Sequence, residues 1–338
     1  MKTIRFGPDQ NMRLTEPLDT WLSAGLRDYA VPEAIGSSAR VFGLDYAPLA
    51  GDYEDNPAIK IMRPDKTLYA LPLFRSEVRI LNRMKDVPGI TPIKGLGFLK
   101  VTEGNWPQEI SPLTTTCLEN ASALQLRGEV QLFDPSEIET FLSALDGQVE
   151  EGWLAFLILP RRWEDNLYLR CDAGYTRGEY HRSFSVNEAL KAALQICEIL
   201  KQAHEKHIVY LDHKALHFYW NQPRQQVFMI DWNIGRIITN ENSQEVYAFD
   251  VLQFSARALH HILTGRQALG SVNVGPNKQE EILKAPKTYD PIWTYDDQKR
   301  LTGDEMDVLG NAIQGQYTTA SALGQALQKL YDRRESQS

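Results

Sequence analysis

Two short stretches in the second half of the chain decide the fold. Residues 208–220 read IVYLDHKALHFYW, and residues 227–233 read VFMIDWN. Each begins as an apolar, β-type run and delivers one carboxylate, Asp212 in the first and Asp231 in the second. Lys214 follows the first carboxylate by two residues. Phosphoryl transfer needs such a set, because one carboxylate orients an attacking hydroxyl, the lysine balances phosphate charge and the second carboxylate holds a metal ion.

The two stretches resemble the protein kinase superfamily, in particular a divergent, bacterial serine/threonine-kinase-like chain. The segment 210–217 stands where the family has H-R-D-x-K-x-x-N, and it keeps the aspartate and the lysine. The D-F-G motif becomes Asp231-Trp232-Asn233, which keeps the carboxylate and an aromatic residue but loses the glycine. The resemblance implies that Asp212 is the catalytic base, that Lys214 contacts phosphate and that Asp231 holds Mg²⁺ on ATP.

The first half of the chain carries further landmarks of the family in the expected order. Ala58-Ile59-Lys60 matches the strand lysine, so the resemblance assigns Lys60 to the α- and β-phosphates and Glu77 to an ion pair with Lys60. The glycine-rich loop is the weakest match, because residues 34–41 read AIGSSARV and keep only Gly36 ahead of Val41. We therefore expect weaker or more selective nucleotide binding than in the family.

The hinge of such a kinase is expected directly after Leu159. Pro160 has no amide hydrogen to donate but offers its carbonyl, and the backbone amide near Arg162 is the expected donor to an adenine nitrogen. The pattern changes there from short β-type runs to long helical stripes. The resemblance thus implies an α+β, protein-kinase-like two-lobed fold, with a small antiparallel-sheet N-lobe over residues 31–160 and a mainly helical C-lobe over 161–334.

Individual elements follow from hydrophobic periodicity. We predict strands at residues 40–43, 58–62, 95–99 and 153–159, helices at 73–84 and 135–145, and apolar helical stripes at 186–200 and 252–263. Residues 1–30 are partly helical in pattern, with Leu18, Trp21, Leu22 and Leu26 at helical spacing, and are predicted to be an N-terminal extension. Residues 102–151 break the rhythm of short strands and are predicted to be an insertion.

Composition excludes several classes of protein. The 36 Lys and Arg residues against 44 Asp and Glu residues leave a net charge of −8, which disfavours nucleic acid and anionic lipid as partners. The three cysteines show no CxxC spacing, so reduced thiols are expected. The N-terminus lacks an apolar core, and the longest apolar run is too short to span a bilayer. We expect a cytoplasmic protein without a membrane partner.

Four histidines, His204, His207, His213 and His217, lie close together in the sequence. The segment HEKH at 204–207 is one residue short of the zinc motif HExxH, so its imidazoles do not share a helical face and zinc is given little weight. His217 stands where kinases use an asparagine to hold a second Mg²⁺. Imidazole prefers softer ions, so Mn²⁺ is an alternative cofactor. The competing interpretation is that His217 only packs beside its aromatic neighbours.

The departures from the family bear on function. Asp231 and Asp250 are only nineteen positions apart, too few for the long activation segment on which protein kinases dock peptides, and Leu211 replaces the regulatory arginine. The favoured hypothesis is an ATP- and Mg²⁺-dependent phosphotransferase with an unknown protein or small-molecule acceptor. The alternatives are a pseudokinase, acting as a nucleotide-binding or protein-interaction module, and a small-molecule kinase.

Overall fold

The structure is a computed structural model in which the chain divides into two compact units. Unit 1 comprises Met1–Asn82 and Thr91–Arg162, and unit 2 comprises Arg83–Ile90 and Trp163–Ser338. Each unit is described by itself. The residues that the structure describes are 2–6, 12–17, 38–45, 57–63, 67–103, 124–160, 162, 165–171, 174–176, 179–181, 184–239, 243–271 and 285–337.

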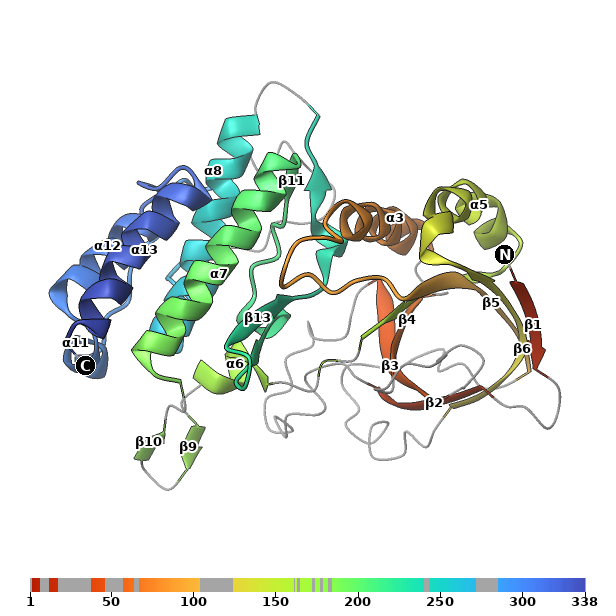
Figure 1. Ribbon diagram of the computed structural model, residues 1–338, viewed down its shortest axis with the longest axis horizontal. Coiled ribbons are helices and arrows are strands. Elements are labelled where there is room, and N and C mark those ends of the chain that lie inside the picture. The colour runs from red at the N-terminus through yellow and green to blue at the C-terminus, as the bar shows by residue number, and fades with distance from the viewer. Residues whose placement is uncertain are drawn as a thin grey trace. The chain divides into compact units, whose positions relative to one another are not determined.

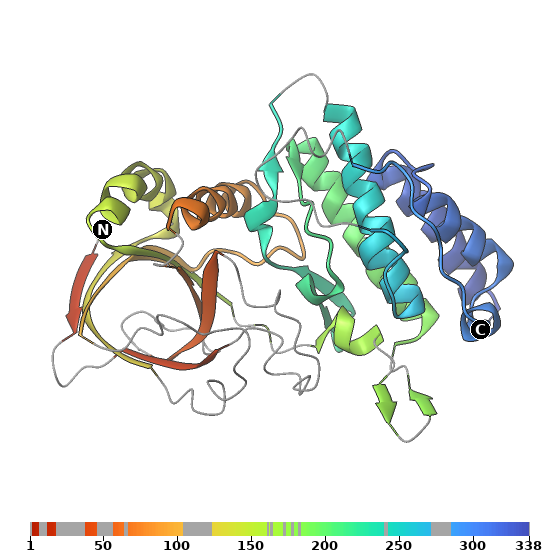
Figure 2. The same cartoon turned by 180° about the vertical axis from the view of Figure 1, so that it is seen from behind.

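Unit 1 is built on one antiparallel sheet of seven strands. They are β1 (Lys2–Phe6), β2 (Met12–Pro17), β3 (Ala39–Asp45), β4 (Ala58–Met62), β5 (Gly95–Glu103), β6 (Leu124–Phe133) and β7 (Leu154–Leu159). Their order is β1-β6-β2-β3-β4-β7-β5, and β6 also pairs with β5. The sheet therefore closes on itself, as the curved arrows of unit 1 show in Figures 1 and 2. The four predicted strands are confirmed as β3, β4, β5 and β7.

Segments outside the predicted lobe core complete this sheet. The predicted extension supplies β1 and β2, and the predicted insertion supplies β6, which is hydrogen-bonded to β1, β2 and β5. The helical pattern of residues 18–26 lies outside the described residues. Alternation alone did not reveal β1 and β2, because pairing with a strand more than a hundred residues away is a long-range event that local periodicity does not report.

Two helices pack on the outer face of the sheet. Helix α3 spans Thr67–Arg83, six residues longer at its start than predicted, and it continues through Pro72. Helix α5 spans Ile138–Glu150, following a short 3₁₀ turn at Pro135–Glu137, and confirms the helix predicted at 135–145. Phe141 of α5 stacks on Phe98 of β5 with ring centroids 4.7 Å apart, which anchors this helix to the sheet.

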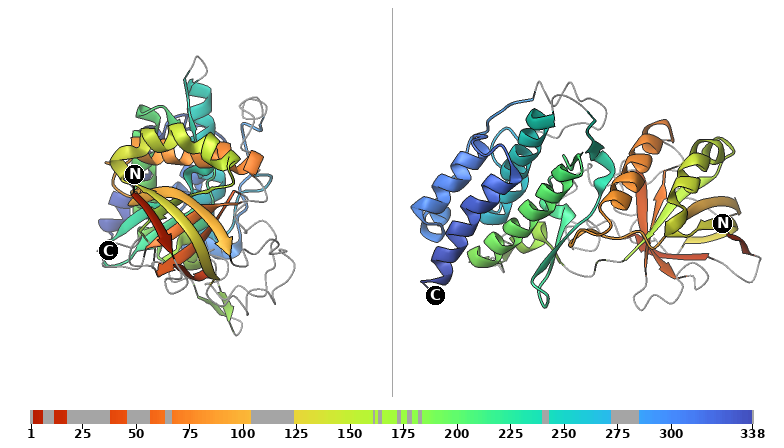
Figure 3. Two further views of the ribbon diagram at one scale, coloured as in Figure 1. Left: turned by 90° about the vertical axis from the view of Figure 1, so that its right-hand side faces the viewer. Right: turned by 45° about the horizontal axis from the view of Figure 1, so that its top comes forward.

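The long helix of unit 2 is α7 (Val186–Glu205), and it confirms the apolar stripe predicted at 186–200. Ser185 caps its first turn in a capping box with Glu188, which satisfies amides that the helix leaves without a partner. Helix α13 (Ala320–Glu335) lies alongside α7, as Figure 3 shows. At Gly324 an added Cβ would lie 3.4 Å from Cβ of Cys197, so the absence of a side chain allows this close approach.

The stripe predicted at 252–263 forms one continuous helical stretch. It runs through α8 (Ser243–Gln253), a π-helical segment at Phe254–Leu259 and α9 (His260–Thr264), and it is mostly buried from Val246 onward. The remaining helices of the described part of unit 2 are α6 (Leu167–Cys171), α11 (Tyr295–Arg300) and α12 (Gly303–Ile313). None of the helices in the described ranges is long and apolar enough to cross a membrane.

The two stretches from which the fold was predicted contain short strands of unit 2. Strand β11 (Ile208–Val209) pairs with β14 (Arg236–Ile237). The hairpin of β12 (Phe218–Asn221) and β13 (Gln226–Met229) pairs on one side with β8 (Asp165–Asn166). A separate hairpin is formed by β9 (Gly174–Thr176) and β10 (Glu179–His181). The mixture of an antiparallel-sheet unit and a mainly helical unit confirms the α+β prediction.

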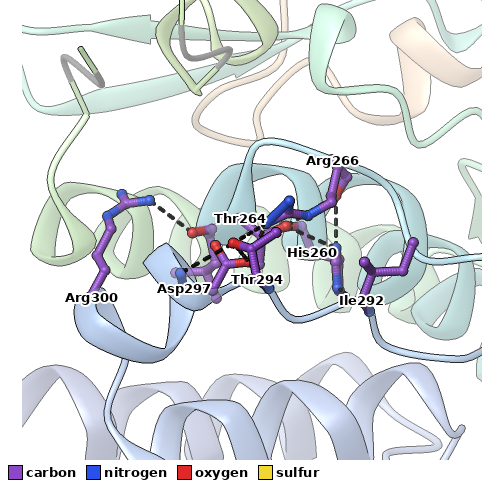
Figure 4. A network of polar contacts seen from close by, with 8 residues as sticks. His260, Thr264, Arg266, Ile292, Thr294, Asp297 and Arg300 are labelled. Atoms are coloured by element: carbon purple, nitrogen blue, oxygen red, sulfur yellow. Dashed lines mark hydrogen bonds and ion pairs between the residues drawn. The ribbon is translucent and has the colours of Figure 1, made fainter. Parts of the chain in front are cut away.

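A polar network joins α9 to the segment before α11 (Figure 4). His260 Nδ1 donates to the carbonyl of Arg266 at 2.7 Å, so Nε2 carries the lone pair and accepts from the amide of Ile292 at 3.4 Å. The Arg266 guanidinium bonds both to the Thr294 hydroxyl, at 3.1 Å, and to the Asp297 carboxylate. The network holds His260 as a neutral imidazole inside unit 2.

Acid should destabilise unit 2 through His260. Burial lowers the pKa of His260 from its ordinary value of 6.5, so the unfolded chain takes up a proton more readily than the folded one. The stability that neutral His260 contributes is present above that value and is lost as pH falls through the lower, folded pKa. His260→Asn keeps a donor near Nδ1 but does not titrate. We expect the unfolding midpoint of the wild type to fall more steeply than that of this variant between about pH 7.5 and 5. Parallel pH profiles in thermal unfolding would contradict the assignment.

Candidate active site

The loop after β11 brings the predicted catalytic residues together. Asp212 is 3% exposed, and its carboxylate oxygens lie 3.2 and 3.3 Å from Nζ of Lys214. The amide of Lys214 donates to the carbonyl of Asp212 at 2.8 Å, which closes a tight turn between the two residues. Lys214 itself is in extended backbone. The turn therefore places a buried carboxylate and a partly exposed ammonium group side by side.

His217 lies between the two predicted carboxylates. Its Nδ1 is 3.1 Å from the backbone carbonyl of Asp212, and because a carbonyl only accepts, Nδ1 carries the hydrogen. Nε2 therefore bears the lone pair, and it lies 3.6 Å from Oδ2 of Asp231. Burial lowers the pKa of His217, and the carboxylates of Asp212 and Asp231 oppose this effect without cancelling it. The imidazole is neutral at physiological pH and presents a lone pair toward Asp231.

Asp231 follows β13 in a left-handed backbone conformation, with φ 59° and ψ 60°. The next residue, Trp232, is fully buried, and its ring meets that of Tyr210 edge-on with centroids 4.7 Å apart. The hydroxyl of Tyr210 donates to the carbonyl of Ile230 at 2.7 Å. In the return direction, the amide of Ile230 donates to the carbonyl of His217 at 3.0 Å. These contacts join the segment that bears Asp231, just after β13, to the loop that bears Asp212.

Asp212, His217 and Asp231 form a group whose ligand atoms lie within 4.8 Å of one another. Two of these atoms, Nε2 of His217 and Oδ2 of Asp231, can each offer an electron pair to a cation that lies between them. Metal–nitrogen and metal–oxygen distances of about 2.0–2.2 Å each allow one ion to bridge the observed 3.6 Å. Asp231 and His217 fit a divalent cation, because a carboxylate with an imidazole suits Mn²⁺ as well as Mg²⁺, and the nearby Asp212 stays available as a base.

The loop over residues 210–217, the predicted catalytic loop, rests on Asp250 of α8. This carboxylate is fully buried and accepts from the amides of Tyr210 and Leu211 at 3.1 and 2.8 Å. Burial alone would raise the pKa of Asp250, but charge interactions with His213 and hydrogen bonds from His204 and His213 hold it well below its usual range. Leu211 has a φ of 67°, a conformation that costs a β-carbon-bearing residue about 1–3 kcal/mol. The two bonds to Asp250 stabilise this strained turn.

Unit 1 contains the second predicted pair. Nζ of Lys60 on β4 lies 2.8 Å from Oε1 of Glu77 on α3, and both side chains are buried. Lys60 stands opposite Val41 of β3 and Leu157 of β7 in the sheet. The close contact offsets part of the cost of burying two charges and fixes the orientation of the lysine side chain.

Of the other residues predicted to contact nucleotide, the structure describes all but Gly36. Val41 is half-buried in β3, and Leu159 ends β7, where it pairs with Ala58. Arg162 is partly buried, two residues beyond Pro160. Gly36 lies outside the described residues, as does the first half of the predicted glycine-rich loop, residues 34–37. The structure thus groups Asp212, Lys214, His217 and Asp231 in unit 2 and Lys60 with Glu77 in unit 1, and it leaves the hinge and loop assignments as predictions.

Sequence reasoning missed two residues at this site. His204 and His213 were considered only for a zinc site, but their Nε2 atoms lie 2.9 and 2.7 Å from the carboxylate of Asp250. Their sequence separations from Asp250 are 46 and 37 residues, so no local motif connects them to it. The available signal was the concentration of histidines around the predicted loop, which indicated that imidazoles are used there but not for what purpose.

The antiparallel sheet of unit 1 and the helices of unit 2 define an α+β fold with one sheet-based unit and one mainly helical unit. No protein-family model matches the chain, and no curated protein gives a significant sequence match. Among solved structures, the chain is similar to the kinase PK-1 of the Cydia pomonella granulovirus. The two are 12% identical over 92% of each chain, with a TM-score of 0.48. A likeness of this degree assigns neither activity nor substrate.

Proposed function

We propose that the protein is an ATP- and divalent-cation-dependent phosphotransferase of the serine/threonine-kinase type. One observation carries the proposal: the buried carboxylate of Asp212 lies beside Lys214 and in a common cluster with His217 and Asp231. Metal-bound ATP, when present, supplies the phosphoryl group and the divalent charge. The side chains of the protein supply the base, the positive charge next to the phosphoryl group and the ligands of the cation.

In this proposal Asp212 receives the proton of the acceptor hydroxyl. The hydroxyl oxygen forms the new bond to phosphorus, the bond from phosphorus to the ADP oxygen breaks, and ADP leaves with that electron pair. The Lys214 ammonium group, at 3.2 Å from Asp212, balances the charge of the carboxylate and interacts with the charge on the transferred phosphoryl group. Asp231 and His217 hold the cation. Lys60, oriented by Glu77, is assigned to the α- and β-phosphates on the resemblance.

Calorimetric titration of the purified full chain with ATP, with and without Mg²⁺, tests this proposal together with a transfer assay. Saturable binding that needs the cation, followed by release of ADP when a hydroxyl acceptor is supplied, supports a phosphotransferase. Binding without any turnover supports the pseudokinase alternative, in which the cluster serves only to hold nucleotide. Absence of binding at millimolar ATP and cation would overturn both nucleotide-dependent functions.

The short segment between Asp231 and α8 favours a second candidate for the acceptor. Only eleven residues separate Asp231 from Ser243, where α8 begins. Part of this segment is pinned, because β14 pairs with β11 and the amide of Ile238 donates to the carbonyl of His207 at 2.7 Å. So short a connection leaves little chain to align an extended peptide. A small-molecule hydroxyl is therefore the second candidate, and parallel assays with serine peptides and with polyols distinguish the two classes of acceptor.

His217 should set the preference among cations. Its Nε2 lone pair, 3.6 Å from Asp231, favours an ion that accepts nitrogen ligands, so Mn²⁺ should support ATP binding or turnover better than Mg²⁺. His217→Asn replaces nitrogen by an amide oxygen and should shift the preference toward Mg²⁺. The measurement is the dissociation constant of ATP in each cation. His207→Asn is the matched control, because His207 is exposed and lies outside the cluster. Identical cation profiles for wild type and His217→Asn would show that His217 only packs there.

A further inference from the structure

We propose that His213, together with His204, is a positioning residue that aims Asp212 at the acceptor by clamping the catalytic loop onto Asp250. The inference rests on the proposed function and adds to it the device that orients the base. Its core is one buried carboxylate that accepts four hydrogen bonds. Two come from backbone amides of the loop, and two come from imidazoles.

The two oxygens of Asp250 are used symmetrically. Oδ1 accepts from Nε2 of His213 at 2.7 Å and from the amide of Leu211 at 2.8 Å. Oδ2 accepts from Nε2 of His204 at 2.9 Å and from the amide of Tyr210 at 3.1 Å. Each oxygen thus has one donor that the loop supplies through its backbone and one imidazole donor. This arrangement fixes the rotation of the carboxylate, and with it the positions of both amides.

His213 can hold Asp212 and Lys214 in place, because it stands directly between them in the sequence. Its side chain is completely buried, and its ring lies among those of Tyr210, Phe218 and Phe254, with centroids 5.0–6.5 Å away. The amide of Lys214 donates to the carbonyl of Asp212, so His213 is the central residue of the turn that brings Nζ of Lys214 to the Asp212 carboxylate. Holding the ring of His213 against Asp250 therefore holds this turn in place.

His204 supports the clamp from the other side. It lies in the last turn of α7, and its ring stacks on that of Tyr247 in α8, with centroids 4.7 Å apart and an interplanar angle of 20°. The stacking fixes the ring plane, so Nε2 is directed at Asp250 and not at solvent. The clamp consequently joins α7, α8 and the catalytic loop, three segments of unit 2, at a single carboxylate.

The position of the donor nitrogen in the His213 side chain gives a direct test of this role. His213 uses Nε2, the nitrogen far from the backbone, and the side-chain amide of glutamine places its nitrogen at a similar reach, whereas that of asparagine is shorter. His213→Gln should therefore keep the bond to Asp250, while His213→Asn and His213→Leu should lose it. For the last two we expect kcat to fall about 10- to 100-fold with KM for ATP changed little, since a small misplacement of a reacting group is enough for such a loss. His213→Gln should restore most of kcat.

Hydrogen–deuterium exchange of peptides covering residues 208–214 supplies a readout that does not depend on turnover. The amides of Tyr210 and Leu211 should exchange faster in His213→Leu than in His213→Gln, with the unfolding midpoint recorded for each variant. If the wild type transfers no phosphate, the proposed function fails while exchange still decides the positioning role. Equal exchange and equal kcat in folded His213→Leu and His213→Gln would overturn the proposal. A kcat of His213→Gln as low as that of His213→Leu would also overturn it.

Discussion

Asp231→Ala should abolish cation-dependent ATP binding, with a loss of affinity of at least about 100-fold, or about 2.8 kcal/mol. Asp231 supplies the carboxylate oxygen that lies 3.6 Å from Nε2 of His217, and without it the cation site retains a single donor on that side. Alanine at a φ of 59° also adds backbone strain. Asp231→Asn is therefore measured in parallel, because asparagine tolerates this conformation while removing the negative charge, and it should lose most of the affinity.

The matched control is Asp212→Asn. Asp212 is proposed to receive a proton, so its amide variant should bind ATP and cation nearly as the wild type does while transfer falls by about 10²–10⁴-fold. Calorimetry gives the binding constants, and ADP release gives the rate. Lys60→Met should weaken binding without abolishing it, because one phosphate contact is lost. Unchanged affinity in Asp231→Ala would contradict the metal assignment, and unchanged turnover in Asp212→Asn would contradict the assignment of the base.

The second large effect concerns stability. Asp250→Ala should lower the free energy of unfolding by roughly 3–5 kcal/mol, the usual cost of removing one partner from a buried, charged hydrogen-bond network. The substitution leaves two amides and two imidazoles without their acceptor in a fully buried position. Because a whole domain is stable by only about 5–15 kcal/mol, the unfolding midpoint should fall by many degrees.

Asp304→Ala is the control for that measurement. Asp304 also pairs with a cation, Arg333, but both side chains are more than half exposed, at 62% and 60%. Exposed ion pairs contribute about 0–1 kcal/mol, so this variant should unfold close to the wild type. Chemical denaturation with both variants at one pH separates the two cases. A loss at Asp250 no larger than that at Asp304 would show that the loop does not depend on its anchor.

The two stretches at 208–220 and 227–233 were sufficient to predict the α+β architecture. Chemistry-bearing residues at fixed short spacings, such as Asp212 and Lys214, are constrained by one turn, and a turn is a local structure. Long apolar stripes such as that of α7 are likewise local, since 3.6-residue periodicity is written into consecutive residues. The helix over 135–145 was found in the same way.

Other features depended on contacts that no local pattern encodes. Closure of the sheet of unit 1 requires β6 to pair with both β2 and β5, which come from two separate parts of the chain. The start of α3 at Thr67 was missed because the first turns of the helix, before Leu73, lack the apolar periodicity from which the helix was predicted. In these cases long-range pairing and burial outweighed local propensity.

The sequence by itself determined which chemical groups are present and in what order: two carboxylates, a lysine and a histidine at spacings suited to a phosphate and metal site, preceded by Lys60 and Glu77. Only the tertiary structure decided how those groups are oriented. It showed that Lys60 contacts Glu77 at 2.8 Å, that Nε2 of His217 points toward Asp231, and that His204 and His213 donate to Asp250. The physical reason is that spacing within one turn fixes neighbours along the chain, whereas a hydrogen bond between residues 37 or 46 positions apart exists only once helices and loops have packed.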